Sequence, residues 1–172
     1  PAAAQAFRGR AGVAPLLDLL ARVEPAAGPP LGQALRRVFP RLRRRGLAVL
    51  VPDFLADAER QGGWRRAVDF LHHRRVRLVG VHVIAASERD PGALGAVRLV
   101  DAEGGGEVLV DVDEARRADY MARFARHVRE VGAYLREREA RHVVVDAGAP
   151  PAALVRTLLR AGLLRWGGVD EA

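Results

Sequence analysis

Residues 78–84 read LVGVHVI, an unbroken apolar run that is typical of a strand covered on both faces of a sheet. Similar runs occur on both sides of it in the sequence, LAVLV at 47–51 and HVVVD at 142–146. A helical pattern up to about residue 74 separates the first two runs, and its apolar positions are Trp64, Ala67, Val68 and Leu71. Strand, helix and strand in this order predict a parallel, right-handed crossover.

The remaining segments complete a βα-type pattern. Helices are expected over 14–23 and 31–42, and a last one over 151–161. Residues 97–100 and 108–112 alternate around a glycine-rich loop, which predicts an antiparallel hairpin. A long helix capped by Asp113 is expected to reach about Arg141, with an inner, core-forming face made of Tyr120, Phe124, Val128, Val131 and Leu135. The fold class predicted is α/β, a doubly wound, mostly parallel sheet with an inserted hairpin, in a single domain over 1–172.

The composition excludes several chemistries. The chain has no Cys, Lys or Asn and only one Ser and one Thr. Without Lys there is no Walker-type phosphate loop or Schiff-base lysine, and without Cys there is no disulfide or thiolate site. We therefore assign no catalytic residue and expect the protein not to be an enzyme. Arg interrupts every hydrophobic run before it reaches the length of a membrane span, so a cytoplasmic location is expected.

Carboxylates follow each of the three predicted parallel strands. In open parallel sheets, ligands bind beyond the carboxyl ends of the strands, so these side chains are expected to share one rim. Carboxylates in such places also cap helices, and Asp53 has both interpretations, as a helix cap or as a ligand of Mg²⁺. No other cofactor is expected. The predicted rim consists of Asp53, Asp57, Glu88, Asp90 and Asp146.

Arginines gather at the opposite end, before the first two strands. Two interpretations fit them: they complement helix dipoles at helix C-termini, or, with a net charge of +7 and a pI near 11.2, they bind nucleic acid. Of the five histidines, His82 falls inside a predicted buried strand and is expected to be a core residue with its hydrogen bonds satisfied. The arginines concerned are Arg41, Arg43, Arg44, Arg45, Arg74, Arg75 and Arg77.

These segments together resemble the C-terminal portion of the DUF58 family, from about Val13 to Arg165. The resemblance is carried by LAVLVPDFLAD at 47–57, HVI at 82–84, the hairpin at 97–115, the helix around Tyr120 and HVVVD at 142–146. It implies a von Willebrand factor A-like, Rossmann-like fold. It also implies bacterial proteins often encoded beside MoxR-type AAA+ ATPases, with which they act as partners in chaperone-like assembly.

The resemblance also implies where a metal-ion-dependent adhesion site would lie. Such a site uses an Asp-x-Ser-x-Ser turn after a first strand, a Thr in a second loop and an Asp in a third. Only the last maps here, onto Asp53, because Gly28, Pro29 and Pro30 stand where the Thr is expected. The first turn is not in the chain, so we expect a fragment whose missing first strand would lie beside 47–51 and would leave that edge unpaired.

The function predicted is a protein-protein interaction module that uses the rim, with a MoxR-type AAA+ ATPase as the expected partner and no membrane segment in the chain. Two alternatives stay open. One is an Arg-rich nucleic-acid-binding domain, and the other is a metal-dependent hydrolase at Asp53. Salt-sensitive nucleic-acid binding would favour the first, and metal-stimulated turnover abolished by Asp53→Ala would favour the second.

Overall fold

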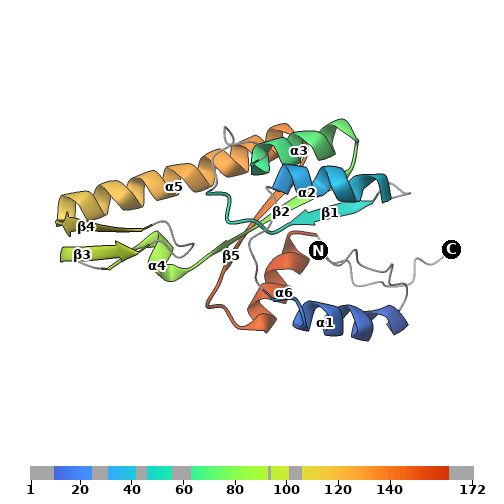
Figure 1. Ribbon diagram of the computed structural model, residues 1–172, viewed down its shortest axis with the longest axis horizontal. Coiled ribbons are helices and arrows are strands. Elements are labelled where there is room, and N and C mark those ends of the chain that lie inside the picture. The colour runs from blue at the N-terminus through green and yellow to red at the C-terminus, as the bar shows by residue number, and fades with distance from the viewer. Residues whose placement is uncertain are drawn as a thin grey trace.

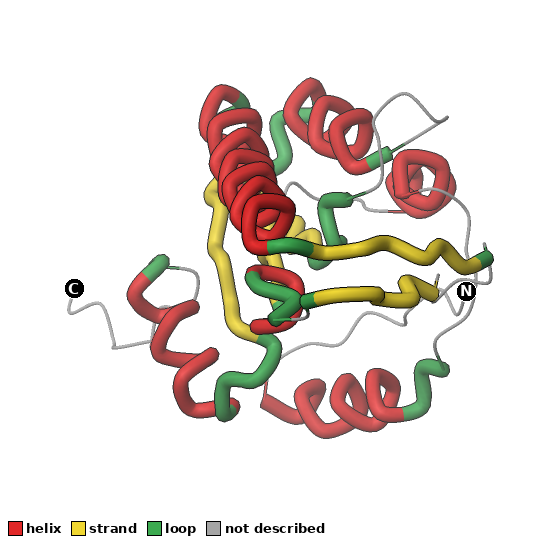
Figure 2. The backbone as a smooth tube through the Cα atoms, turned by 90° about the vertical axis from the view of Figure 1, so that its left-hand side faces the viewer, coloured by secondary structure: helices red, strands yellow, loops and turns green. Residues whose placement is uncertain are grey.

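A computed structural model describes residues 10–24, 31–41, 46–55, 63–92, 94–100 and 106–162. Its elements form a mixed α/β molecule with helices on both faces of a sheet (Figures 1 and 2). The predicted positions that fall outside these ranges are Asp57, the turn at 28–30, and Arg43, Arg44 and Arg45.

Three parallel strands form the sheet. They are β1 (Leu47–Leu50), β2 (Arg77–Ile84) and β5 (Arg141–Asp146), in the order β1-β2-β5. The register places Leu47 opposite Arg77 and Ile84 opposite Asp146. The parallel arrangement predicted from the three apolar runs is thereby confirmed, and the carboxyl ends of β2 and β5 meet at one end of the sheet.

Helices α2 (Leu31–Val38), α3 (Trp64–His73) and α5 (Glu114–Glu137) cover one face, and a 3-10 turn (Phe39–Arg41) follows α2. The four apolar positions predicted for α3 are all buried, and the ring of Phe54, from the loop after β1, is fully buried among them. The larger core of the molecule therefore lies between this helix layer and the sheet. Its buried residues are Leu50, Phe54, Trp64, Ala67, Val68, Leu71, Leu78, Val131, Leu135 and Ala140.

The opposite face is covered by α6 (Pro151–Arg160), whose Leu158 packs on a four-valine cluster from β2 and β5. Helix α1 (Val13–Ala21) lies on the same side, after a 3-10 turn (Arg10–Gly12), and buries none of its residues. The expectation that β1 is covered on both faces is wrong. Val49 is 51% exposed, because the described helices on this side lie over β2 and β5 and leave the outer face of β1 open.

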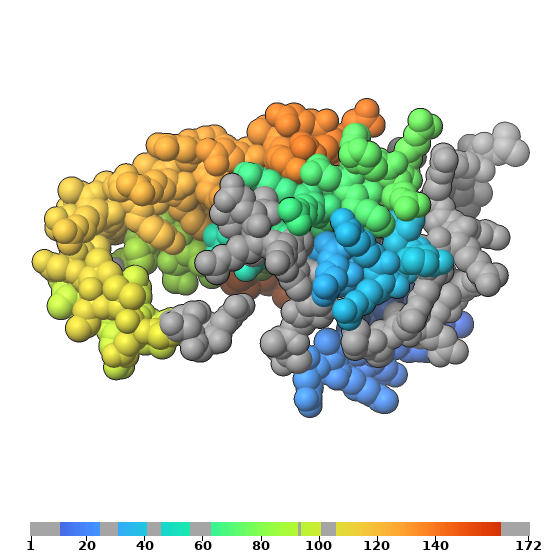
Figure 3. Space-filling model, turned by 45° about the horizontal axis from the view of Figure 1, so that its top comes forward, coloured from blue at the N-terminus to red at the C-terminus, as the bar shows by residue number. Residues whose placement is uncertain are grey.

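The hairpin consists of β3 (Gly95–Val100) and β4 (Glu107–Val112), which pair antiparallel as predicted. A short helix, α4 (Ala86–Arg89), links β2 to it. The hairpin and the first half of α5 extend past the end of the sheet, where α5 forms a continuous ridge (Figures 1 and 3). The prediction that the aromatics of α5 belong to the core is therefore wrong for Tyr120, which is 41% exposed.

Helices α3 and α5 end in the same way. In each, the residue after the C-cap has a positive φ, 54° at Arg75 and 57° at Glu139, and two backbone N–H groups bond back to the last helical turn. This is the Schellman arrangement, which satisfies carbonyls left free at a helix end. It stops α5 at Glu137, four residues before the predicted end, and a strand begins directly afterwards.

Candidate functional site

The described rim carboxylates lie after the strands as predicted, but each one makes local hydrogen bonds. Asp53 accepts a hydrogen bond from the Leu55 amide at 3.1 Å, and Asp146 accepts one from the Gly148 amide at 2.8 Å. Glu88 accepts from the Ala85 amide at the start of α4. Glu88 makes a helix-cap contact, whereas Asp53 and Asp146 make turn contacts with the amide two residues on. The helix-cap interpretation of Asp53 is not supported, because α3, the next described helix, begins at Trp64 with Gly63 as its N-cap.

Asp90 makes the strongest contact of the rim, with Arg117 of α5. The Arg117 Nε donates to Oδ1 at 2.7 Å and Nη2 donates to Oδ2 at 2.5 Å, which makes the pair bidentate. The hydrogen bond from Arg117, with a second from the Gly92 amide, lowers the pKa of Asp90 to about 2. Tyr120 adds a hydrogen bond from its hydroxyl to the Glu88 carbonyl at 2.7 Å. The segment after β2 is thus fastened to the overhanging half of α5.

A metal centre is not assembled by the part of the chain that the structure describes. No three His, Cys, Asp or Glu side chains there come together in a group that could hold an ion. Asp53 accordingly has no described partner for the Mg²⁺ role that the sequence suggested.

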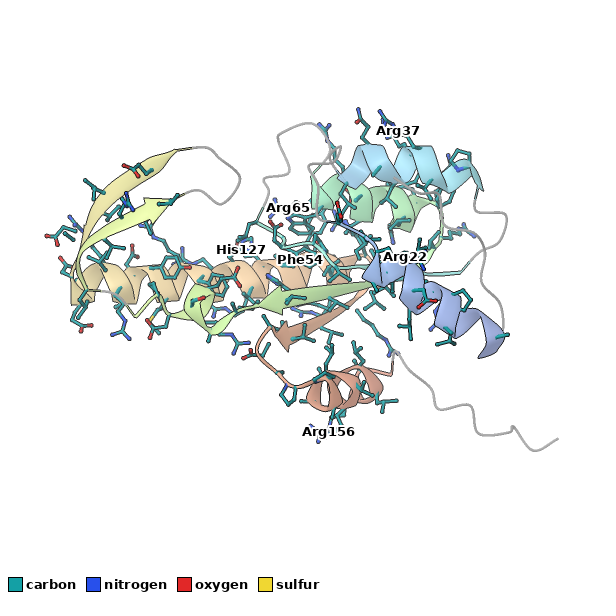
Figure 4. The ribbon with its side chains drawn as sticks, turned by 60° about the horizontal axis from the view of Figure 1, so that its bottom comes forward. Arg22, Arg37, Phe54, Arg65, His127 and Arg156 are labelled. Carbon is teal, nitrogen blue, oxygen red and sulfur yellow. The ribbon has the colours of Figure 1, made fainter. Side chains whose placement is uncertain are left out.

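Three histidines and Phe54 pack together beneath α5, at the carboxyl half of the sheet. His82 of β2 is 2% exposed, and its ring centroid lies 4.9 Å from that of Phe54, 5.6 Å from that of His142 and 6.4 Å from that of His127. Phe54 and His127 are labelled in Figure 4. Burial, followed by the two neighbouring imidazoles, lowers the pKa of His82 to about 4. Burial, followed by the charge of Arg136, also lowers the pKa of His142.

His82 and His142 are therefore neutral at pH 7, and the hydrogen bonding of the three imidazoles is incomplete. Among the described residues, Nδ1 of His82 and Nε2 of both His127 and His142 are buried without a partner. The expectation that His82 is a core residue is confirmed, but the expectation that its hydrogen bonds are satisfied is wrong. The cluster itself was missed, because His82, His127 and His142 come from three elements and their sequence spacing gives no signal.

An apolar hollow of about 470 Å³ opens next to the rim, between α5 and the carboxyl ends of β2 and β5. Two of the α5 residues that line it have exposed apolar side chains, so the hollow is open to solvent. Its position follows from the course of α5, whose first half runs past the end of the sheet above the hairpin (Figure 1). The hollow is lined by Ile84, Arg89, Met121, Phe124, Ala125, Val128 and Val144.

At the opposite end of the sheet, two of the described arginines, Arg74 and Arg141, make contacts inside the molecule. The guanidinium of Arg74 lies 5.2 Å from the ring centroid of Phe39 and 5.5 Å from that of Phe70. Arg141 donates to the Ala161 carbonyl at the C-terminal end of α6. Stacking on aromatic rings and capping of a helix end are structural uses of arginine. For these side chains the structural interpretation is favoured over nucleic-acid contact.

Comparison with known proteins gives a family. The model of the family described as "Protein of unknown function DUF58" matches residues 4–130. The chain belongs to the DUF58 family. The matched segment contains β1, β2, the hairpin and most of α5, whereas β5 and α6 follow it. The earlier resemblance is confirmed at this level.

Other comparisons add little to the DUF58 assignment. No curated protein matches the chain. A solved structure described as an uncharacterized membrane spanning protein from Vibrio fischeri is 14% identical, with a TM-score of 0.30; the alignment covers 86% of this chain and 65% of that one. The DUF58 chain thus spans slightly less than two thirds of that protein. Within the described residues, none of the helices has the length and apolar character needed to cross a bilayer.

Proposed function

We propose that this DUF58 chain is a von Willebrand factor A-like protein-protein interaction module, a single domain over 1–172 with no catalytic role. The proposed partner is a MoxR-type AAA+ ATPase, with which the module would act in assembly or in a chaperone-like role. This choice of partner is supported by the membership in the DUF58 family, because the resemblance to that family implies an AAA+ partner. The observation that carries the proposal is the apolar hollow beside the rim.

Such a hollow suits a binding surface for two physical reasons. Exposed apolar side chains gathered at one place are unfavourable in water, and on a protein surface they mark sites that another molecule covers. The rim segment is also held firmly, because the Asp90–Arg117 pair and the Tyr120 hydroxyl tie it to α5. A preorganised surface loses less conformational entropy on binding than a loose one.

The test is direct binding between purified proteins. The full-length protein would be mixed with a MoxR-type AAA+ ATPase from the same organism, with and without ATP, and separated by size-exclusion chromatography. We expect the two to elute together. Separate elution at micromolar concentrations of both proteins would contradict the proposal. The contradiction would be clearest if, in addition, the module alone bound DNA or RNA with an affinity that falls steeply as the salt concentration rises.

A further inference from the structure

The wall of the hollow formed by α5 is a regular helical stripe. Met121, Phe124, Ala125 and Val128 are spaced at i, i+3, i+4 and i+7, so they lie along one side of the helix. Met121 is 39% exposed, and Phe124 and Val128 are only half-buried. The stripe therefore presents a row of apolar side chains, with Val144 of β5 forming the floor beside it.

A stripe of this kind suits a helix as its counterpart. The ridges of one helix fit between side chains spaced three and four apart on another, and an amphipathic helix in a groove is a recurrent way of binding partners. The volume of about 470 Å³ falls in the range of roughly 300–1,000 Å³ that protein pockets offer to bound groups. The hollow therefore has room for a few large side chains but not for a second domain.

Among the described residues that line the hollow, the charged one is an arginine. Arg89 lies in its lining, and Arg129 is one helical turn beyond Ala125. Both are exposed, and within the described residues neither has an ion-pair partner. The nearby rim acids are not part of this lining: Asp90 is paired with Arg117, whereas Glu88 and Asp146 accept backbone amide hydrogen bonds and, like the two arginines, have no ion-pair partner among the described residues.

We infer that the hollow binds an amphipathic helix of a partner protein, whose apolar face is flanked by carboxylates. This inference rests on the proposed function and deepens it by giving the chemistry of the partner segment. Its apolar side chains enter between α5 and β5, and its carboxylates meet Arg89 and Arg129. The expected partner segment is thus acidic, although an acidic rim alone would have suggested a basic one.

The experiment selects peptides from a random displayed library against the full chain. We expect the enriched sequences to carry apolar residues three and four positions apart, together with Asp or Glu. Binding of the best synthetic peptide, followed by fluorescence anisotropy, should be lost in Met121→Asp. In the double variant Arg89→Glu, Arg129→Glu it should weaken about tenfold, because exposed charge pairs contribute little individually and reversal adds repulsion.

The matched control is Arg156→Glu on α6, an exposed arginine that points away from the hollow (Figure 4). This substitution changes the charge by the same amount as each substitution of the double variant, and it should leave peptide binding unchanged. A Lys-for-Glu version of the peptide should prefer the double variant to the wild type. Circular dichroism checks that every variant keeps its fold.

Three outcomes would overturn the inference: no enriched peptide, enriched peptides that are basic, or equal binding to the wild type and the Met121→Asp variant. A failure of this inference can be distinguished from a failure of the proposed function. If the ATPase still forms a complex with Met121→Asp and with the Arg89, Arg129 double variant, the module binds its partner elsewhere. The proposed function would then stand and the assignment of the hollow would fall.

Discussion

Gly80 is the position at which β2 comes closest to the layer of helices above it. A Cβ built there would lie 2.7 Å from Leu135 Cδ1 and 3.0 Å from Phe54 Cζ, inside normal contact distance. We expect Gly80→Ala to lower the free energy of unfolding by about 1–3 kcal/mol, because the core must shift to accept the methyl group. Urea titration measures the change.

The control for this prediction is Gly46→Ala at the start of β1, where a Cβ would meet no atom within 4 Å. Its effect should stay within about 0.5 kcal/mol, as for most exposed substitutions. Equal effects at the two positions would show that the helix layer does not pack on β2 as described.

His82 makes the stability of the fold depend on pH. Its pKa is about 4 in the folded state, against an ordinary value of 6.5, so between these two values the unfolded chain binds more protons. The contribution of the neutral imidazole is therefore complete above pH 6.5 and is lost as the pH falls towards 4. The loss should reach up to about 3 kcal/mol, measured by urea unfolding at a series of pH values.

Other groups around His82 titrate or carry charge: His127 and Arg136 on α5, His142 on β5, and Glu88 on α4. His142 contributes in the same direction, since its pKa is lowered too. The variant His82→Leu should flatten the dependence between pH 6.5 and 4, whereas His73→Gln at an exposed position should not. An unchanged slope in His82→Leu would contradict a buried, neutral His82.

The sequence allowed the burial of His82 to be predicted but not its surroundings. Its place in the middle of an apolar run indicates a core position, because alternate faces of that strand are both covered. Nothing in the run indicates that residues 127 and 142 bring two more imidazoles to the same point. That arrangement depends on which turn of α5 crosses β2, a property of packing that no local pattern records.

Among the elements, the ends of α3 and α5 offer the clearest prediction. Glu139 adopts a φ of 57°, a conformation that costs an L-residue with a side chain about 1 kcal/mol and costs glycine very little. We expect Glu139→Gly to stabilise the protein by about 0.5–1 kcal/mol, seen as a higher midpoint in urea. Arg75→Gly at the end of α3 should act in the same direction. Destabilisation by both would contradict the Schellman endings.

The strands were predictable because each is a short apolar run bounded by charged or turn residues. The end of α5 was not, since a non-glycine residue closes it and the usual stop signal is missing. The cover over β1 was also predicted incorrectly. Its run looks like that of β2, but Val49 is exposed while Val79 is buried, and only the position of α6 distinguishes them.

Across the whole molecule, many of the described charged side chains are already engaged in contacts within the protein. The positions of the charged residues in the sequence indicate an acidic end and a basic end of the sheet. The described carboxylates of the acidic end accept local hydrogen bonds from backbone amides or, in Asp90, pair with Arg117. Arg74 at the basic end is stacked on aromatic rings. Net charge alone therefore does not predict the partner, and the surface proposed for binding is the apolar hollow beneath the overhang of α5.

Hydrogen-deuterium exchange of the full-length protein, alone and mixed with a MoxR-type AAA+ ATPase, the proposed partner, tests the central claim most directly. The claim predicts that binding slows exchange in the first half of α5, in 84–92 and in 144–148, which surround the hollow. Slower exchange confined to the opposite end of the sheet, around 74–77 and 139–141, would contradict it.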